Sequence, residues 1–160
     1  MTGGDDSVGL EFSQPIRMAV RVGRPIADAF GLFTTRINSW WPLETHSFGI
    51  GRSPELILEP RIGRRFFERY ADGEEHTNGT VLAWQPPELV AFTWQHDEWI
   101  APTEVHVRFV AEDSNLTRVE LEHRGWERLG QVGVESREMY ANGWPAVIAR
   151  FLEAAAAPDG

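Results

Sequence analysis

The sequence has 160 residues, a formal net charge of −9, no cysteine and seven tryptophans, and all 15 of its basic residues are arginine. The absence of cysteine excludes disulfides, thiolate nucleophiles and thiolate metal sites, and the absence of lysine excludes Schiff-base chemistry and a P-loop lysine. The acidic balance argues against a broad basic surface, so we expect no nucleic-acid partner.

In chain order, residues 1–13 come first, and their richness in Gly, Asp and Ser predicts a flexible N-terminal tail. This segment carries acidic residues and no basic one, so it does not resemble a signal peptide, and no apolar run in the chain approaches the roughly 20 residues that span a membrane. We therefore expect a cytoplasmic protein without membrane insertion. A chain of this size holds one hydrophobic core, which predicts a single domain over residues 14–157.

The first strand is expected at Ile16–Val22, where apolar residues alternate with polar or small ones. A short helix follows from Pro25, because proline is tolerated early in a helix and the next apolar residues repeat with helical spacing. Those residues are Ile26, Ala29, Phe30 and Phe33. A second short helical turn is expected at Thr35–Ser39, and Pro42 ends it.

The middle of the chain consists of β-rich runs separated by short turns that contain Gly, Pro, Asp or Asn. The expected strands are Glu55–Glu59, Arg64–Tyr70, Gly79–Trp84, Leu89–Gln95, Thr103–Ala111 and Thr117–His123. Turns this short favour an antiparallel meander over parallel crossovers. Helical spacing returns at Glu135–Ala156, where we expect a long helix with a kink or a restart at Pro145.

This order predicts an α+β fold with two short helices after the first strand. A curved antiparallel sheet of six to seven strands must cover its apolar face, and only the C-terminal helix is long enough to do so. We expect the sheet to wrap around that helix and to leave a ligand cavity between the two layers.

Six stretches of the chain resemble, in the same order, the helix-grip fold of the START/Bet v 1-like superfamily (SRPBCC), and in particular its branch named after the activator of Hsp90 ATPase. They are Pro25–Thr34, Trp40–Gly49, Glu59–Phe66, Gly79–Trp94, Thr117–Trp126 and Gly143–Leu152. The resemblance implies a cavity for lipid, sterol, polyketide or similar hydrophobic ligands. It departs from the branch in having Ile62-Gly63 where Gly-Gly is usual, and the Hsp90 activator itself has a second domain that does not fit in 160 residues.

Strand alternation predicts which side chains face the cavity. On the strand at Arg64–Tyr70, the less charged set contains Phe66, Glu68 and Tyr70, so we expect this set to point inward and Phe67 to point outward. The candidate ligand-binding residues are Trp40, Trp41, Phe66, Tyr70, Phe92, Trp94, Val107, Phe109, Leu121, His123, Tyr140, Trp144 and Ile148. The two adjacent tryptophans, Trp40 and Trp41, could form either a stacking wall at the mouth or a hydrophobic plug.

Three functions remain open from the sequence. The first is binding of a small hydrophobic or aromatic molecule in the cavity. The second is a cyclase-like or hydrolase-like enzyme that uses Glu68 and His123 as acid and base, with Tyr70 or Tyr140 as a hydroxyl donor. For His123 a buried, hydrogen-bonded role is the favoured alternative to catalysis. The third, implied only by the family resemblance, is an Hsp90-type co-chaperone.

No motif indicates a cofactor, and we expect none. His96-Asp97-Glu98 has the composition of a metal site, but neighbouring strand residues point to opposite faces, so we expect no metal. A cluster of arginines (61, 64, 65 and 69) should pair with the nearby acids Glu59, Glu68, Glu74 and Glu75, and binding to an acidic partner is the alternative. An exposed strand edge or the surface at Trp40 and Trp41 could support a homodimer.

Overall fold

The structure, a computed structural model, describes residues 13–158; the tail expected at residues 1–13 lies almost wholly outside this range. The elements follow one another as β1 (Ile16–Val22), α2 (Ile26–Phe33), η1 (Ile37–Ser39), β2 (Glu55–Leu58), β3 (Arg65–Arg69), β4 (Glu75–Gln85), β5 (Leu89–Trp94), β6 (Thr103–Asp113), β7 (Leu116–Arg124), η2 (Trp126–Leu129) and α3 (Gln131–Ala156). This order confirms the expected α+β class and the two short helical segments after the first strand.

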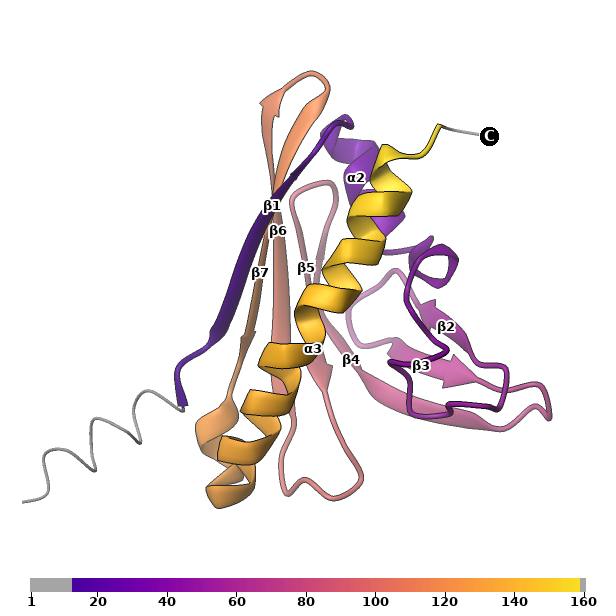
Figure 1. Cartoon of the computed structure of the whole chain (residues 1–160), viewed down its shortest axis with the longest axis vertical. Helices are drawn as coiled ribbons and strands as arrows, with labels where there is room; N and C mark the ends of the chain where they lie inside the picture. The colour runs from indigo at the N-terminus through magenta and orange to yellow at the C-terminus, as the bar shows by residue number, and fades with distance from the viewer. Residues whose placement is uncertain (1–12, 159–160) are drawn as a thin grey trace, which may run out of the picture.

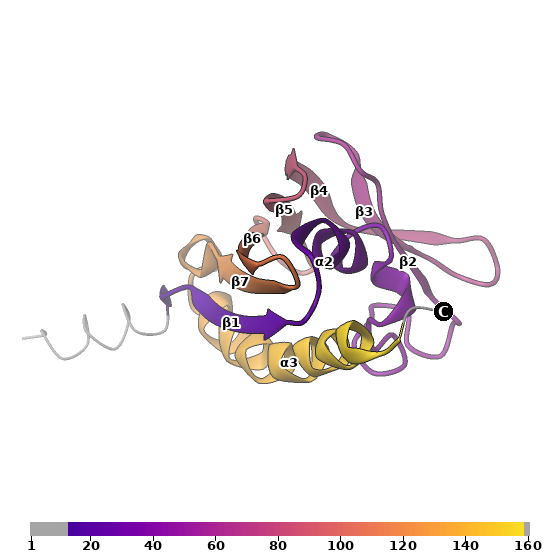
Figure 2. The ribbon, with the colours of Figure 1, turned by 90° about the horizontal axis from the view of Figure 1, so that it is seen from above.

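The seven strands between residues 13 and 158 belong to one antiparallel sheet with the order β1-β7-β6-β5-β4-β3-β2. The strands from β2 to β7 form a meander, and β1 joins its far end by pairing with β7. The sheet is curved, and α3 crosses its concave side along most of its length (Figures 1 and 2). The helix-grip fold is thereby confirmed.

Three elements differ from expectation. Strand β4 begins at Glu75, four residues before the expected Gly79. Its first half pairs with β3, but this half is polar, so no apolar alternation marks it in the sequence. Helix α3 begins at Gln131 and runs through Pro145 without a restart. The 3-10 helix η2, at Trp126–Leu129, had no counterpart in the sequence pattern.

Phe67 lies on the outer face with Arg65 and Arg69, as strand alternation predicts, yet it is only 2% exposed. It does not belong to the main core cluster; the guanidinium carbons of the two arginines lie 3.9 and 5.4 Å from the centre of its ring and cover it. The stems and heads of arginine side chains can shield apolar surface in this way, so an outward residue is buried without entering the core.

The C-terminal end of α3 is capped by Arg24, a buried arginine in the turn between β1 and α2. Its guanidinium donates to the carbonyl oxygens of Ala154, Ala155 and Ala157 and to the carboxylate of Asp28. The last carbonyl groups of a helix have no partner within the helix, and a cation there also complements the helix dipole. Arg24 therefore fixes the position of α3 across the sheet.

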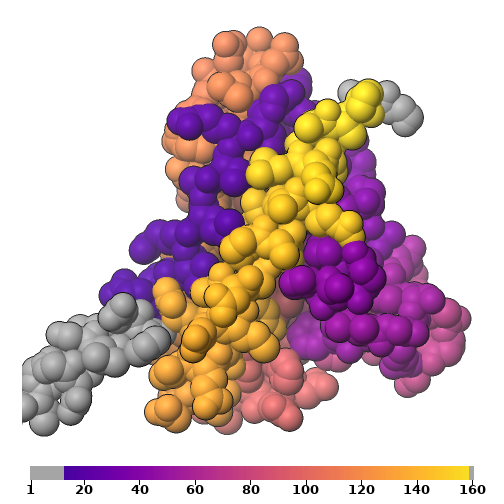
Figure 3. Space-filling model, viewed as in Figure 1, coloured from indigo at the N-terminus to yellow at the C-terminus, as the bar shows by residue number. Residues whose placement is uncertain are grey.

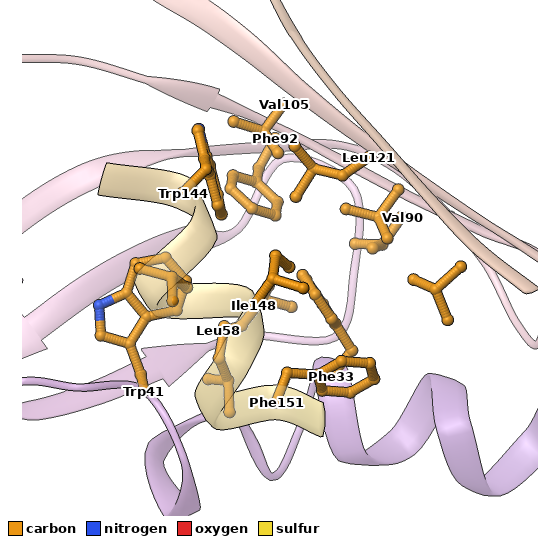
Figure 4. Packing of buried hydrophobic residues seen from close by; sticks show 14 of the residues in the cluster. Phe33, Trp41, Leu58, Val90, Phe92, Val105, Leu121, Trp144, Ile148 and Phe151 are labelled. Carbon is orange, nitrogen blue, oxygen red and sulfur yellow. The ribbon is translucent and has the colours of Figure 1, made fainter. Parts of the chain in front are cut away.

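Aromatic side chains fill the end of the interior that lies beneath α2 and the C-terminal half of α3. The ring of Phe33 packs against those of Trp40, Phe109 and Phe151 at centroid distances of 5.1 to 5.9 Å. Figure 4 shows Phe33 beside Phe151, with Ile148 and the sheet residues Val90 and Phe92 nearby. Closely packed rings therefore fill this end of the interior, and the open space lies toward the middle of α3.

Candidate functional site

A cavity of about 370 Å³ lies between the sheet, the middle of α3 and the segment that connects η1 to β2. It is lined by Trp41, Thr45, His46, Ser47, Phe48, Glu68, Asn78, Trp94, His96, Met139, Tyr140, Gly143, Trp144 and Val147. The connecting segment lies alongside α3 on the molecular surface (Figure 3), and Glu44 in this segment pairs with Arg150 of the helix. Met139, which is 58% exposed, marks the rim.

Four of the thirteen candidate ligand-binding residues line this cavity: Trp41, Trp94, Tyr140 and Trp144. The other nine are buried or nearly buried in closed packing: Trp40, Phe66, Tyr70, Phe92, Val107, Phe109, Leu121, His123 and Ile148. The strand pattern placed most of them on the inner face of the sheet, helical spacing placed Ile148 on the facing side of the helix, and Trp40 was expected at the mouth, but this interior is longer than the cavity. The structure thus separates residues that face inward from residues that face open space.

The adjacent tryptophans have different roles. Trp41 lines the cavity, and its indole N–H donates to the carbonyl of His46 at 2.7 Å, which ties the connecting segment to the core. Trp40 is a plug: its N–H donates to the carbonyl of Leu32, and its ring lies 5.1 Å from that of Phe151. Trp40 is thus part of the packed core, and Trp41 is the residue of the pair that lines the cavity.

Sequence reasoning did not place nine lining residues in the cavity: Thr45, His46, Ser47, Phe48, Asn78, His96, Met139, Gly143 and Val147. Most belong to the connecting segment or to loop and strand ends without a periodic pattern. The only available signals were that His46 follows Trp-Trp-Pro in a loop and that Gly143 interrupts the apolar face of a helix. Both signals are weak, because the sequence does not show which residues lie across the cavity from His46 and Gly143.

Glu68 is the buried acid of the cavity and is 1% exposed. Its two carboxylate oxygens accept four hydrogen bonds. One oxygen accepts from the backbone N–H of Gly49 at 3.1 Å and the hydroxyl of Tyr70 at 2.9 Å; the other accepts from the N–H of Phe48 at 2.9 Å and the side-chain amide of Asn78 at 3.3 Å. An ionised carboxylate offers about four lone-pair positions, so these neutral donors satisfy it fully.

The backbone around Glu68 is shaped by Gly49. A Cβ atom at this position would lie 2.0 Å from the ring of Tyr70, a separation that real Cβ atoms essentially never show. The missing side chain lets the N–H groups of Phe48 and Gly49 approach the carboxylate together. The connecting segment is thereby anchored to β3, which forms one wall of the cavity.

Two tyrosine hydroxyls lie near the cavity, and they differ in their hydrogen-bond partners. Burial raises the pKa of Tyr70, and the hydrogen bond that its phenol donates to Glu68 raises it further. Burial also raises the pKa of Tyr140 to about 12, against a smaller opposing effect of the hydrogen bond that its oxygen accepts from the indole N–H of Trp94 at 2.8 Å. The Tyr140 hydroxyl is thus a neutral group in the cavity wall.

His123 is fully buried and does not line the cavity. Its Nδ1 accepts from the indole N–H of Trp144 at 3.0 Å, so the ring proton lies on Nε2, 2.7 Å from the hydroxyl oxygen of Thr103. Desolvation lowers the pKa of His123 to about 3. Both ring nitrogens are occupied, and the structure does not bring His123 and Glu68 together as an acid–base pair around the cavity.

Arg64, Arg65 and Arg69 of the arginine cluster pair with acids on the outer surface, and no ion pair of Arg61 is present among residues 13–158. Arg64 and Arg65 bind Glu59, and Arg65 and Arg69 share Glu75. Two expected partners are corrected: Glu74 pairs with Arg52, and Glu68 points away from the cluster into the cavity, because alternate residues of β3 face opposite sides of the sheet.

Over the described range, residues 13–158, no group of three or more His, Asp or Glu side chains is arranged to hold a metal ion. Of the sequence His96-Asp97-Glu98, only His96 reaches the cavity, and Asp97 instead lies 3.4 Å from the ring of His76. Within the same range no helix has the length and apolar character needed to cross a membrane.

Comparison with known proteins gives one family match. The model of the family described as "Activator of Hsp90 ATPase homolog 1-like protein" matches residues 24–157. This range contains every element from α2 to α3 and every residue of the cavity wall. No curated protein matches the chain.

Solved structures resemble the chain over most of its length. An anthrahydroquino-γ-pyrone synthase, Txn09, is 32% identical, with a TM-score of 0.54 and coverage of 78% of this chain and 84% of that one. A self-sacrificing resistance protein, CalC from Micromonospora echinospora, is 25% identical, with a TM-score of 0.66 and coverage of 90% and 95%. Protein MLL2253 from Mesorhizobium loti, 14% identical with a TM-score of 0.66 and coverage of 88% and 95%, shares the fold alone.

Proposed function

Given that the chain belongs to the activator of Hsp90 ATPase homolog 1-like family, we propose that it binds a small aromatic molecule in the cavity beneath α3. The observation that carries this proposal is the lining. Five aromatic side chains, Trp41, Phe48, Trp94, Tyr140 and Trp144, surround the space together with a few polar groups. Small-molecule sites are concave, mostly apolar and supplied with a small number of placed polar groups.

The volume indicates the size of the ligand. An engineered cavity of about 150 Å³ accommodates benzene, so a cavity of 370 Å³ corresponds to two or three fused rings. Flat molecules suit the wall, since the rings of Trp41 and Trp94 stack on each other at a centroid distance of 6.1 Å and an interplanar angle of 25° and so form one continuous aromatic surface. Stacking of a ligand on such rings adds about 0.5–1.5 kcal/mol per ring pair beyond the burial of apolar area.

The related synthase supports the same class of ligand. Its name describes a fused aromatic compound, and it is 32% identical to this chain. We therefore extend to this protein the binding of a fused-ring aromatic molecule, and not the reaction. The four neutral donors around Glu68 leave its carboxylate no vacant lone pair with which to accept a substrate proton.

The test uses 2-naphthylmethanol, a neutral two-ring probe, and isothermal titration calorimetry. We expect saturable binding at one site per chain. The variant Gly143→Leu should block it, because a Cβ at Gly143 has room, with its nearest neighbour in His46 at 3.7 Å, and the longer side chain then enters the cavity. Ala149→Leu, which adds the same side chain on the exposed side of α3, is the matched control.

We expect Gly143→Leu to weaken binding at least tenfold and Ala149→Leu to leave it unchanged. Equal affinities of the two variants would place the probe elsewhere on the molecule. Absence of binding to the wild-type protein, across a set of two-ring and three-ring aromatic probes, would overturn the proposal.

A further inference from the structure

We infer that the ligand of this cavity carries a positive charge, and that Glu68 selects it as a protonated or quaternary amine attached to an aromatic skeleton. This inference rests on the proposed function of the cavity and adds the chemical class of its ligand. It follows from three observations: an unpaired buried carboxylate, a complete set of hydrogen bonds to that carboxylate, and aromatic walls without a cation.

The first observation is the missing counter-ion. Glu68 lines the cavity at 1% exposure, and within residues 13–158 no arginine or histidine lies within ion-pair distance of its carboxylate. The sequence contains no lysine that could supply one. Burial of a charge is costly unless it is paired, so a cation that enters the cavity gains attraction in a site of low polarisability.

The second observation distinguishes a cation from a neutral hydrogen-bond donor. Phe48, Gly49, Tyr70 and Asn78 already donate to the two oxygens of Glu68. A neutral hydroxyl on the ligand would have to displace one of these donors to form a directional bond. Coulomb attraction needs no vacant lone pair, since the charge of the carboxylate remains after its lone pairs are used.

The third observation concerns the rings. The faces of aromatic rings attract cations, and tryptophan does so most strongly. Outside the cavity this protein uses the effect, with Arg52 4.2 Å from the ring centre of Tyr70 and Arg65 3.9 Å from that of Phe67. Inside the cavity, Trp41, Trp94 and Trp144 are present and no arginine is among the lining residues.

The other charged or titratable groups around the space are consistent with this assignment. His46 and His96 belong to the wall, and His76 stacks on Phe48 with a centroid distance of 4.2 Å. His76 is turned toward other partners, the amide oxygen of Asn78 at 2.9 Å and Asp97 at 3.4 Å. Glu68 is therefore the carboxylate that a ligand meets inside the cavity.

The test compares four probes with one skeleton: 2-naphthylmethylamine, its N,N,N-trimethyl derivative, 2-naphthylmethanol and 2-naphthoate. Calorimetry on the wild-type protein at pH 7 should give at least tenfold tighter binding for both cations than for the alcohol, and the weakest binding for the anion. The trimethylated probe has no N–H group, so its preference over the alcohol reports charge and not hydrogen bonding.

Glu68→Gln should reduce the preference for the cations over the alcohol at least fivefold, and the preference is taken as the ratio of the two affinities on the same variant. Glu122→Gln removes the same charge on the outer face, where Glu122 pairs with Arg17 and Arg124, and should leave the preference intact. If Glu68→Gln does not fold, the comparison of the trimethylated probe with the alcohol on the wild-type protein still decides.

Alcohol binding that equals or exceeds binding of both cations overturns the inference. If Gly143→Leu still blocks the alcohol in that case, the proposed function stands without it. If no naphthyl probe binds the wild-type protein, the proposed function and the inference both fall.

Discussion

Protonation of His123 should control the acid stability of this protein, and the effect can be isolated with one substitution. The pKa of His123 is lowered from 6.5 to about 3 by desolvation. Between these two values the unfolded chain binds a proton at this position and the folded protein does not. The contribution of His123 to the free energy of unfolding is therefore complete above pH 6.5 and is lost as the pH falls toward 3.

The magnitude follows from the two pKa values. One pKa unit corresponds to about 1.36 kcal/mol, so the drop between pH 7 and pH 4 amounts to about 3 kcal/mol from this group alone. The structural cause is burial, because the fully buried ring has no water to solvate its charged form. A loss of this size is a large part of the 5–15 kcal/mol that stabilises a typical domain.

The comparison variant is His123→Gln, which keeps one acceptor toward Trp144 and one donor toward Thr103 but does not titrate. We expect it to cost about 1–3 kcal/mol at pH 7 through imperfect hydrogen bonds and packing. Guanidinium unfolding followed by tryptophan fluorescence, from pH 7 to pH 4, gives the free energy of unfolding of both proteins. Carboxylates titrate in both, so the difference in pH dependence reports His123.

The free energy of unfolding of wild type, relative to that of His123→Gln, should fall by about 3 kcal/mol over this range, so the advantage of wild type at pH 7 disappears or reverses at pH 4. Parallel pH profiles would refute the reasoning, because His123 would then gain its proton in the folded state at an ordinary pH. An NMR titration of the His123 ring provides an independent check: its signal should not shift between pH 7 and pH 4.

Three further predictions concern single side chains. Arg24→Ala should lower the free energy of unfolding by about 2–4 kcal/mol, since three carbonyl groups at the end of α3 lose a charged donor. Guanidinium unfolding measures this loss, and a loss below about 1 kcal/mol would contradict the capping role. Gly49→Ala should weaken binding of the naphthyl cations at least tenfold, because its Cβ displaces the ring of Tyr70 and opens the cradle of Glu68; unchanged calorimetric affinity would contradict this. Gly143→Ala should raise the melting temperature, because alanine is favoured over glycine within a helix by about 0.8–1.0 kcal/mol and its Cβ meets no close neighbour. A lower melting temperature of the variant would contradict this prediction.

The strand and helix order could be predicted because each signal is local. Ile16–Val22 alternates with a period of two, and the helix at Ile26–Phe33 repeats with a period of 3.6, so neither depends on distant residues. The polar start of β4 carries no such pattern. It is a strand because β3 pairs with it, and this pairing is a property of the folded sheet.

In the candidate site, too, local patterns could be predicted and long-range contacts could not. Alternation placed Trp94 and Glu68 on the inner face, and helical spacing placed Tyr140 and Trp144 opposite them. A periodic pattern gives the direction of a side chain and says nothing of what fills the space in front of it. Phe92 has the same pattern as Trp94, yet it packs against Phe66 at a centroid distance of 4.6 Å and meets no cavity.

The sequence by itself thus determined the architecture, the inner face of the sheet and the absence of thiol and amine chemistry. Only the tertiary structure decided where the interior stays open, and that Glu68 has backbone N–H groups as partners in place of an arginine. The physical reason is that both depend on contacts between segments far apart in the chain. Phe33 and Phe151 close one end of the interior, and the segment carrying Phe48 and Gly49 folds over the other.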